Sequence, residues 1–186
     1  LRTLPNLRVF RPCDGLETAA AYAYWAEGKH PVAVVTSRQK LLSPQGTSAE
    51  GAMKGGYILD DSAKPVPDVI LMGSGSEVSL LVRAKGLLAE RGVDARVVSM
   101  PCMEEFDAQK ESYRSSVLPD AVRARVAVEA GSAICWYKYT GIDGATVCKD
   151  DFGLSAPASA LLEINRFTPE DVVAAALKTI KKAGKR

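Results

Sequence analysis

The pattern of residues 68–100 predicts a complete strand–helix–strand unit, and no other stretch constrains the fold as strongly. Asp68–Met72 is apolar after its first residue, and Ala95–Met100 is a second strand-length run that Pro101 ends. Between them, Ser76 can cap a helix that runs to about Arg91 with apolar residues at helical spacing, and Gly92 stands where a helix C′ glycine belongs. Two strands joined by a crossover helix are expected to be parallel neighbours in one sheet.

The same alternation continues toward the carboxyl terminus. A polar-faced helix is expected over Glu104–Ser116, and strands are expected within Val122–Glu129 and at Ala145–Cys148. Thr168 can cap a final helix in which Pro169 takes the first position and acidic residues fill the first turn. Alternating strands and helices predict the α/β class with a mainly parallel sheet.

A shorter unit of the same kind opens the chain. Leu7–Phe10 and Val32–Thr36 have strand character, and Gly15–Glu27 has helical character with Asp14 as its N-cap. Two strands and one helix cannot bury a parallel sheet on both faces. Residues 1–41 are therefore expected to be part of a larger α/β domain, loosely held or paired with another copy.

A stretch rich in glycine and proline separates the two units. Residues 42–67 show little periodicity and are interpreted as a linker, within which Gly56–Asp60 can supply one short strand. Residues 68–186 then form the second domain. The chain begins at Leu1 without an initiator methionine, which suggests a processed or truncated chain.

Charge and cysteine content exclude several classes of function. With 24 basic and 22 acidic residues the formal charge is +2, which argues against a nucleic-acid or membrane partner. The basic tail, Lys178–Arg186, is interpreted as a solvated helix end. The four cysteines form no CxxC pair, which favours reduced thiols, no metal site and a cytoplasmic location.

Two loops are weak candidates for a site. Gly73–Ser76 lies between a strand and a helix, where backbone amides can hold an anion. A dinucleotide fingerprint requires a third glycine where this chain has Val78, so a plain tight turn is favoured over a nucleotide or another anion. The single histidine, His30, lies in a loop and is interpreted as a surface residue rather than a catalytic one.

Arg38 is the stronger candidate. It follows directly on the strand Val32–Thr36, and ligands of open α/β sheets bind beyond the carboxyl ends of strands. The planar guanidinium can bind a phosphate with two charge-assisted hydrogen bonds. An ion pair or a solvated arginine remains the alternative.

Residues along nearly the whole chain, in order and with close spacing, resemble the transketolase family. The first 41 residues resemble the end of its pyrimidine-binding domain, and the stretch from Asp68 resembles its carboxy-terminal domain, which implies a three-layer fold. The matching residues are Asn6–Asp14, Glu17–Ala19, Ser37–Gln39, Val97–Pro101, Phe106, Gln109, Tyr113, Ser116–Pro119, Ala124–Gly131, Trp136, Lys138–Tyr139, Gly141, Gly144, Phe152–Gly153, Ser155–Pro157 and Phe167–Thr168.

The resemblance implies a homodimeric transferase of the pentose phosphate pathway. Such an enzyme uses thiamine diphosphate and Mg²⁺ (or Ca²⁺) to move a two-carbon ketol unit, a glycolaldehyde group, between sugar phosphates. Arg38 matches the family arginine that binds the substrate phosphate.

The other functional residues of the family lie in an earlier domain, so this chain is expected to hold no cofactor, metal or catalytic residue and to be inactive alone. Its partners are then the remainder of a transketolase chain and the sugar phosphates. Two alternatives stay open: a stand-alone anion- or nucleotide-binding regulatory module, and one chain of a split transketolase. For the compartment, a glycosome or plastid is the alternative to the cytoplasm.

Overall fold

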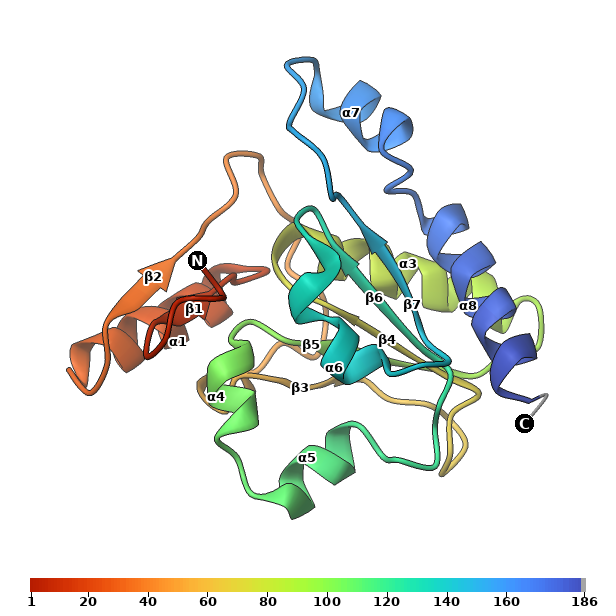
Figure 1. Cartoon of the computed structure of the whole chain (residues 1–186), viewed down its shortest axis with the longest axis horizontal. Helices are drawn as coiled ribbons and strands as arrows, with labels where there is room; N and C mark the ends of the chain where they lie inside the picture. Colours follow the sequence, from red (N-terminus) through yellow and green to blue (C-terminus); the bar gives the residue numbers. More distant parts are fainter. Residues whose placement is uncertain (185–186) are drawn as a thin grey trace.

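A five-stranded sheet in the order β3-β5-β4-β6-β7 organises most of the protein, for which a computed structural model describes residues 1–184 (Figure 1). The strands are β3 (Tyr57–Asp60), β4 (Val69–Gly73), β5 (Ala95–Ser99), β6 (Arg125–Glu129) and β7 (Ala145–Cys148). β3 is antiparallel to β5, and the other pairs are parallel. The mainly parallel sheet expected from the strand–helix alternation is thus confirmed.

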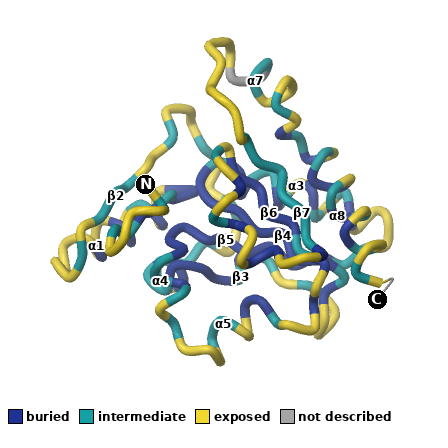
Figure 2. Tube along the Cα trace, in the orientation of Figure 1, coloured by how far each residue is buried: buried dark blue, intermediate teal, exposed yellow. Residues whose placement is uncertain are grey.

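Helices cover both faces of this sheet and make three layers. Alternate residues of each strand face opposite sides, so Leu71 packs under one helical layer and Ile70 under the other. The first layer holds α3 (Val78–Ala89) and α8 (Pro169–Ala183). The second holds α4 (Met103–Asp107), α5 (Glu111–Val117), η2 (Ala133–Cys135) and α6 (Tyr137–Thr140) around the fully buried Trp136. Figure 2 shows the resulting buried centre, with β4 and β5 buried along their whole length.

Several local predictions are confirmed and two need correction. Thr168 caps α8 by accepting a hydrogen bond from the Asp171 amide, and Gly92 adopts φ 73° after α3. The helix expected over 104–116 is two short helices. The carbonyl of Asp107, the last residue of α4, accepts a hydrogen bond from the Arg114 guanidinium at 2.9 Å, which favours the break at this point. α3 begins at Val78, one residue later than a Ser76 cap implies, because the 3₁₀ turn η1 (Gly75–Glu77) precedes it. The helix α7 (Ala158–Ile164) was not expected.

The amino-terminal unit forms a separate two-stranded parallel sheet. β1 (Arg8–Phe10) pairs with β2 (Val32–Val34), and α1 (Gly15–Ala26) connects them with Asp14 as its N-cap. Phe10, together with Ala21 and Tyr24 of α1, packs against Cys102 of the larger domain in a buried hydrophobic cluster. This packing speaks against the expectation that residues 1–41 are loosely held.

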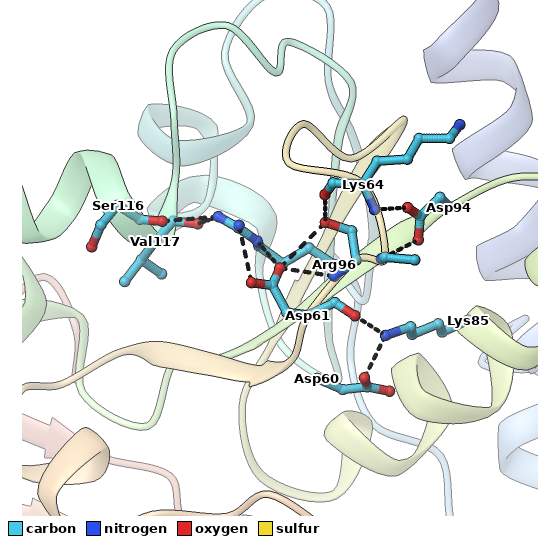
Figure 3. Close-up of polar contacts among 10 residues, drawn as sticks. Asp60, Asp61, Lys64, Lys85, Asp94, Arg96, Ser116 and Val117 are labelled. Atoms are coloured by element: carbon cyan, nitrogen blue, oxygen red, sulfur yellow. Dashed lines mark hydrogen bonds and ion pairs between the residues drawn. The ribbon is translucent and has the colours of Figure 1, made fainter.

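Part of the region interpreted as a linker is folded. It contains α2 (Ala49–Met53) and β3, the strand expected near Tyr57. Asp61, just after β3, pairs with Arg96 at 2.7 Å, and Asp94 accepts the Lys64 amide at 2.7 Å (Figure 3). These contacts lie at the amino ends of β4 and β5, opposite the carboxyl edge at which open α/β sheets bind ligands. We therefore interpret them as anchoring the segment between β3 and β4. The domain boundaries at 41 and 67 stay a prediction.

The end of the basic tail, Lys185 and Arg186, lies outside the described residues.

Candidate functional site

Arg38 lies just beyond the carboxyl edge of the two-stranded sheet. β2 ends at Val34, and the Val35 amide still donates to the Phe10 carbonyl at 2.8 Å. Arg38 is exposed three residues later and, among residues 1–184, makes no hydrogen bond or ion pair. No ion pair of the described chain holds the guanidinium, and the role of Arg38 stays a prediction.

The turn at Gly73–Ser76, the second candidate, is filled by an arginine of the amino-terminal unit. Arg11 directly follows β1, and its carbonyl accepts the Gly75 amide at 2.9 Å. Its guanidinium donates to Ser74 Oγ at 3.3 Å and lies against Gly75, where a Cβ would stand 3.4 Å from Nη2. Gly75 adopts φ 60°, a conformation that favours glycine.

Two carboxylates make this turn a site for a cation. Arg11 Nη2 lies 3.0 Å from Glu77 Oε2, and Nη1 lies 2.8 Å from Glu129 Oε1. Burial alone lowers the pKa of the Arg11 guanidinium, but the charges of Glu77 and Glu129 outweigh it and raise the pKa above its ordinary value. Ser76, expected to cap the following helix, donates instead to Glu77. An anion-binding turn is therefore not what the geometry supports.

The position of this cluster explains why an anion site was a reasonable expectation. β5 and β6 lie on opposite sides of β4 in the sheet, so the order of strands reverses at the carboxyl end of β4. Open α/β sheets bind their ligands in the crevice at such a point. In this protein the Arg11 side chain lies at that point, paired with Glu77 and Glu129.

Glu17, a buried carboxylate that the sequence singled out only through the family resemblance, joins the two units. Glu17 is fully buried, and its Oε1 accepts hydrogen bonds from Ser99 at 2.6 Å and Tyr57 at 2.8 Å. Its Oε2 accepts the Cys13 amide at 2.7 Å. Burial raises the pKa of Glu17, and these three hydrogen bonds offset only part of the effect. The one available signal was a glutamate among the alanines of the buried helix face.

Nucleophilic chemistry finds little support in the described residues. His30 is half-buried, and its ring contacts Asn6 Oδ1 at 2.9 Å and Arg8 Nη2 at 3.3 Å. Burial raises the pKa of the Cys13 and Cys102 thiols, which disfavours the reactive thiolate.

Known proteins with the same pattern supply the identity. Residues 55–168 match the family model described as the transketolase-like TK C-terminal domain. Transketolase 1 of Escherichia coli is 49% identical over 179 residues, and transketolase of Mycobacterium leprae is 48% identical over 182 residues; each match covers 95% of this chain. The chain belongs to the transketolase family.

Solved transketolases share the fold. That of Leishmania mexicana aligns with a TM-score of 0.90 and 41% identity, covering 98% of this chain and 26% of its own. That of Pichia stipitis in complex with sedoheptulose-7-phosphate aligns at 0.92 and 39%, covering 100% and 27%. A split-gene transketolase, an inactive β4 tetramer, aligns at 0.71 and 25%, covering 97% and 60%. The chain spans 27% of the E. coli transketolase and 26% of the M. leprae one.

Transketolases use thiamine diphosphate and a divalent metal. Within residues 1–184, no group of three or more histidine, cysteine, aspartate or glutamate side chains has the arrangement that a metal ion needs. The residues of this part of a transketolase therefore do not fit the metal, and no chemical step is assigned to them through it. The described helices include none that is long and apolar enough to cross a bilayer.

Proposed function

We propose that this chain is the carboxy-terminal portion of a transketolase and that Arg38 binds the phosphate of its sugar-phosphate substrates. The family assignment supports the first part. The exposed, unpaired guanidinium beyond the carboxyl edge of β2 is the observation that carries the second. The parent enzyme then transfers a two-carbon ketol unit between sugar phosphates in the pentose phosphate pathway.

Phosphate recognition suits Arg38 for a simple physical reason. A guanidinium is permanently charged and can donate two parallel hydrogen bonds to a phosphate. In the described chain no carboxylate competes for it, in contrast to Arg11, which two glutamates hold. A related transketolase has been solved with a sugar phosphate, which agrees with this substrate class.

Thiamine diphosphate and Mg²⁺ (or Ca²⁺) belong, in this proposal, to the remainder of the transketolase. We therefore expect the isolated chain to be inactive. Joined to that remainder, it is expected to form part of a homodimeric enzyme. For the compartment we propose the cytoplasm, with a glycosome or a plastid as the organellar alternative; the potato and maize relatives are chloroplastic proteins.

A chimera tests the proposal directly. This chain replaces the matching carboxy-terminal part of E. coli transketolase, which is 49% identical over 179 residues. We expect ketol transfer in the chimera and, for Arg38→Ala, a rise in KM for phosphorylated substrates of about 10–100-fold, the value of lost charged hydrogen bonds. The exposed Arg91→Ala is the matched control and should leave KM unchanged. An inactive chimera, or an unchanged KM in Arg38→Ala, would count against the proposal.

A split enzyme is the second candidate, and one observation favours it. The chain aligns along 97% of its length with a split-gene transketolase. Mixing this chain with a separate polypeptide that holds the earlier transketolase domains should then restore ketol transfer without fusion. A stable complex on size exclusion supports this reading, whereas activity only in the fused chimera contradicts it.

A further inference from the structure

We propose that Arg11 is a positioning residue that couples the five-stranded sheet to the phosphate-binding segment carrying Arg38. The inference rests on the proposed function and deepens it, because it assigns the larger domain a role in substrate binding. Figure 1 shows the β1–α1–β2 unit beside the larger domain, and Arg11 forms main-chain hydrogen bonds to that domain.

Arg11 is held at the carboxyl ends of three adjacent strands. Its amide donates to the Pro101 carbonyl, after β5, at 2.8 Å. Its carbonyl accepts the Gly75 amide, after β4, at 2.9 Å. Its guanidinium reaches Glu129 at the end of β6. Main chain and side chain are thus fixed together to the carboxyl edge of the sheet, and the side chain is only 16% exposed.

The receiving carboxylates are themselves held in place. Glu77 Oε2 also accepts the Ala130 amide at 3.1 Å, and Glu129 also accepts the indole N–H of the buried Trp136. Removing the Arg11 guanidinium takes the 3.0 Å ion pair from the buried Glu77, while Glu129 keeps the ion pair with Arg2 Nε at 3.5 Å. The side-chain part of the anchor is then lost and the end of β1 is held by the two main-chain hydrogen bonds to Pro101 and Gly75 alone, so its position is less firmly fixed.

β1 transmits this position to the Arg38 segment. Phe10, immediately before Arg11, pairs with Val34 and accepts the Val35 amide at 2.8 Å. Because β1 and β2 are parallel, the residues after each strand leave from the same edge. A shift at Arg11 therefore moves Val35, and Arg38 lies three residues further along.

Other contacts keep the unit docked when Arg11 is changed. Glu17 bridges α1 to β3 and β5, and Tyr24 Oη donates to Glu105 at 2.6 Å. An Arg11 variant is therefore expected to fold, with the carboxyl edge of the small sheet loosened.

Kinetics of the chimera separate positioning from a purely structural role. Arg11→Met should raise KM for phosphorylated substrates roughly 3- to 10-fold, a fraction of the effect of losing Arg38 itself, and should leave KM for the same sugars without phosphate unchanged. Arg11→Lys, which keeps the charge, should recover part of the loss. In an Arg38→Ala background the Arg11 effect should vanish, because residues acting through one contact are not additive. Arg91→Met is the matched control.

Two results would overturn the inference. One is an equal loss with phosphorylated and unphosphorylated sugars. The other is an Arg11 effect that persists in full in the Arg38→Ala background. Hydrogen exchange on the 186-residue chain separates a failure of the Arg11 inference from a failure of the proposed role of Arg38. Faster exchange of the Val35 amide, which donates to the Phe10 carbonyl, establishes the coupling in Arg11→Met even if Arg38→Ala leaves KM unchanged, and equal exchange of this amide in wild type and variant refutes it.

Discussion

Glu17→Gln removes the charge from the carboxyl group that bridges α1 and the five-stranded sheet. The side chain keeps its shape, and its carbonyl oxygen can still accept the hydroxyls of Tyr57 and Ser99. The amide nitrogen then faces the Cys13 N–H, which lies 2.7 Å from Oε2 in the native protein. Two donors face each other, and losing that hydrogen bond in a buried place costs about 1–3 kcal/mol.

The negative charge of the ionised Glu17 destabilises the fold, in opposition to the stabilising hydrogen bond from Cys13. The size of this destabilisation depends on pH. Burial holds the pKa of Glu17 above its ordinary value, so the folded state binds this proton more tightly than the unfolded chain does. Stability from this group is full below the unfolded pKa, about 4.3, and is lost as the pH rises through the folded pKa. Each unit by which the pKa is raised corresponds to about 1.4 kcal/mol. The glutamine variant does not titrate and should not show this loss.

Urea unfolding of both proteins between pH 4 and 8 measures the two effects together. The variant should be less stable at pH 4, and the gap in unfolding free energy should narrow as the pH rises. Glu27→Gln, an exposed substitution just past the end of the same helix, is the matched control and should stay within about 0.5 kcal/mol of wild type. A gap that stays constant, or widens with pH, would refute the account of Glu17 as a carboxylate destabilised by burial.

Three other perturbations have expected outcomes. Gly55→Ala places a Cβ 2.2 Å from the Cys102 carbonyl oxygen at φ 83°, so the unfolding free energy measured in urea should fall by more than about 3 kcal/mol. Gly86→Ala lies inside α3 with open space around it and should instead raise the unfolding free energy by about 0.5–1 kcal/mol. Equal effects of the two substitutions would contradict this reasoning. Thr168→Ala removes the N-cap of α8 and should cost about 1 kcal/mol, seen as a lower Tm; an unchanged Tm argues against the cap. The Asp68 pKa is lowered by hydrogen bonds from a lysine and a backbone amide, so the stability it contributes is lost as the pH falls through the folded pKa, and Asp68→Asn should flatten that acid limb.

Local signals predicted the elements that depend on local physics. Thr168 and Pro169 identified the start of α8 because a cap and a fixed φ act within one turn. The apolar runs at β4 and β5 identified buried parallel strands because both of their faces are covered. The position of Arg38 beyond β2 also followed from the strand pattern, and its role as a phosphate contact stays a prediction.

Contacts between distant residues were beyond the reach of such signals. Glu17 finds its partners 40 and 82 residues away, and nothing in its own helix indicates them. Arg11 converts a turn with the geometry of an anion site into a cation site through two glutamates on other elements. α7 has no side-chain cap and no acidic residue in its first turn, so it lacks the signals that identified α8.

The indole of Trp136 is fully buried and donates to the same Glu129 carboxylate that Arg11 contacts. The second of the two tryptophans in the chain, Trp25, is 59% exposed on α1. The intrinsic fluorescence therefore combines a water-exposed emitter with one that has a carboxylate at its ring nitrogen. A change in the Arg11–Glu129 pair alters the field at Trp136 and shifts its emission, so Trp25→Phe converts the protein into an optical reporter of its own domain contact.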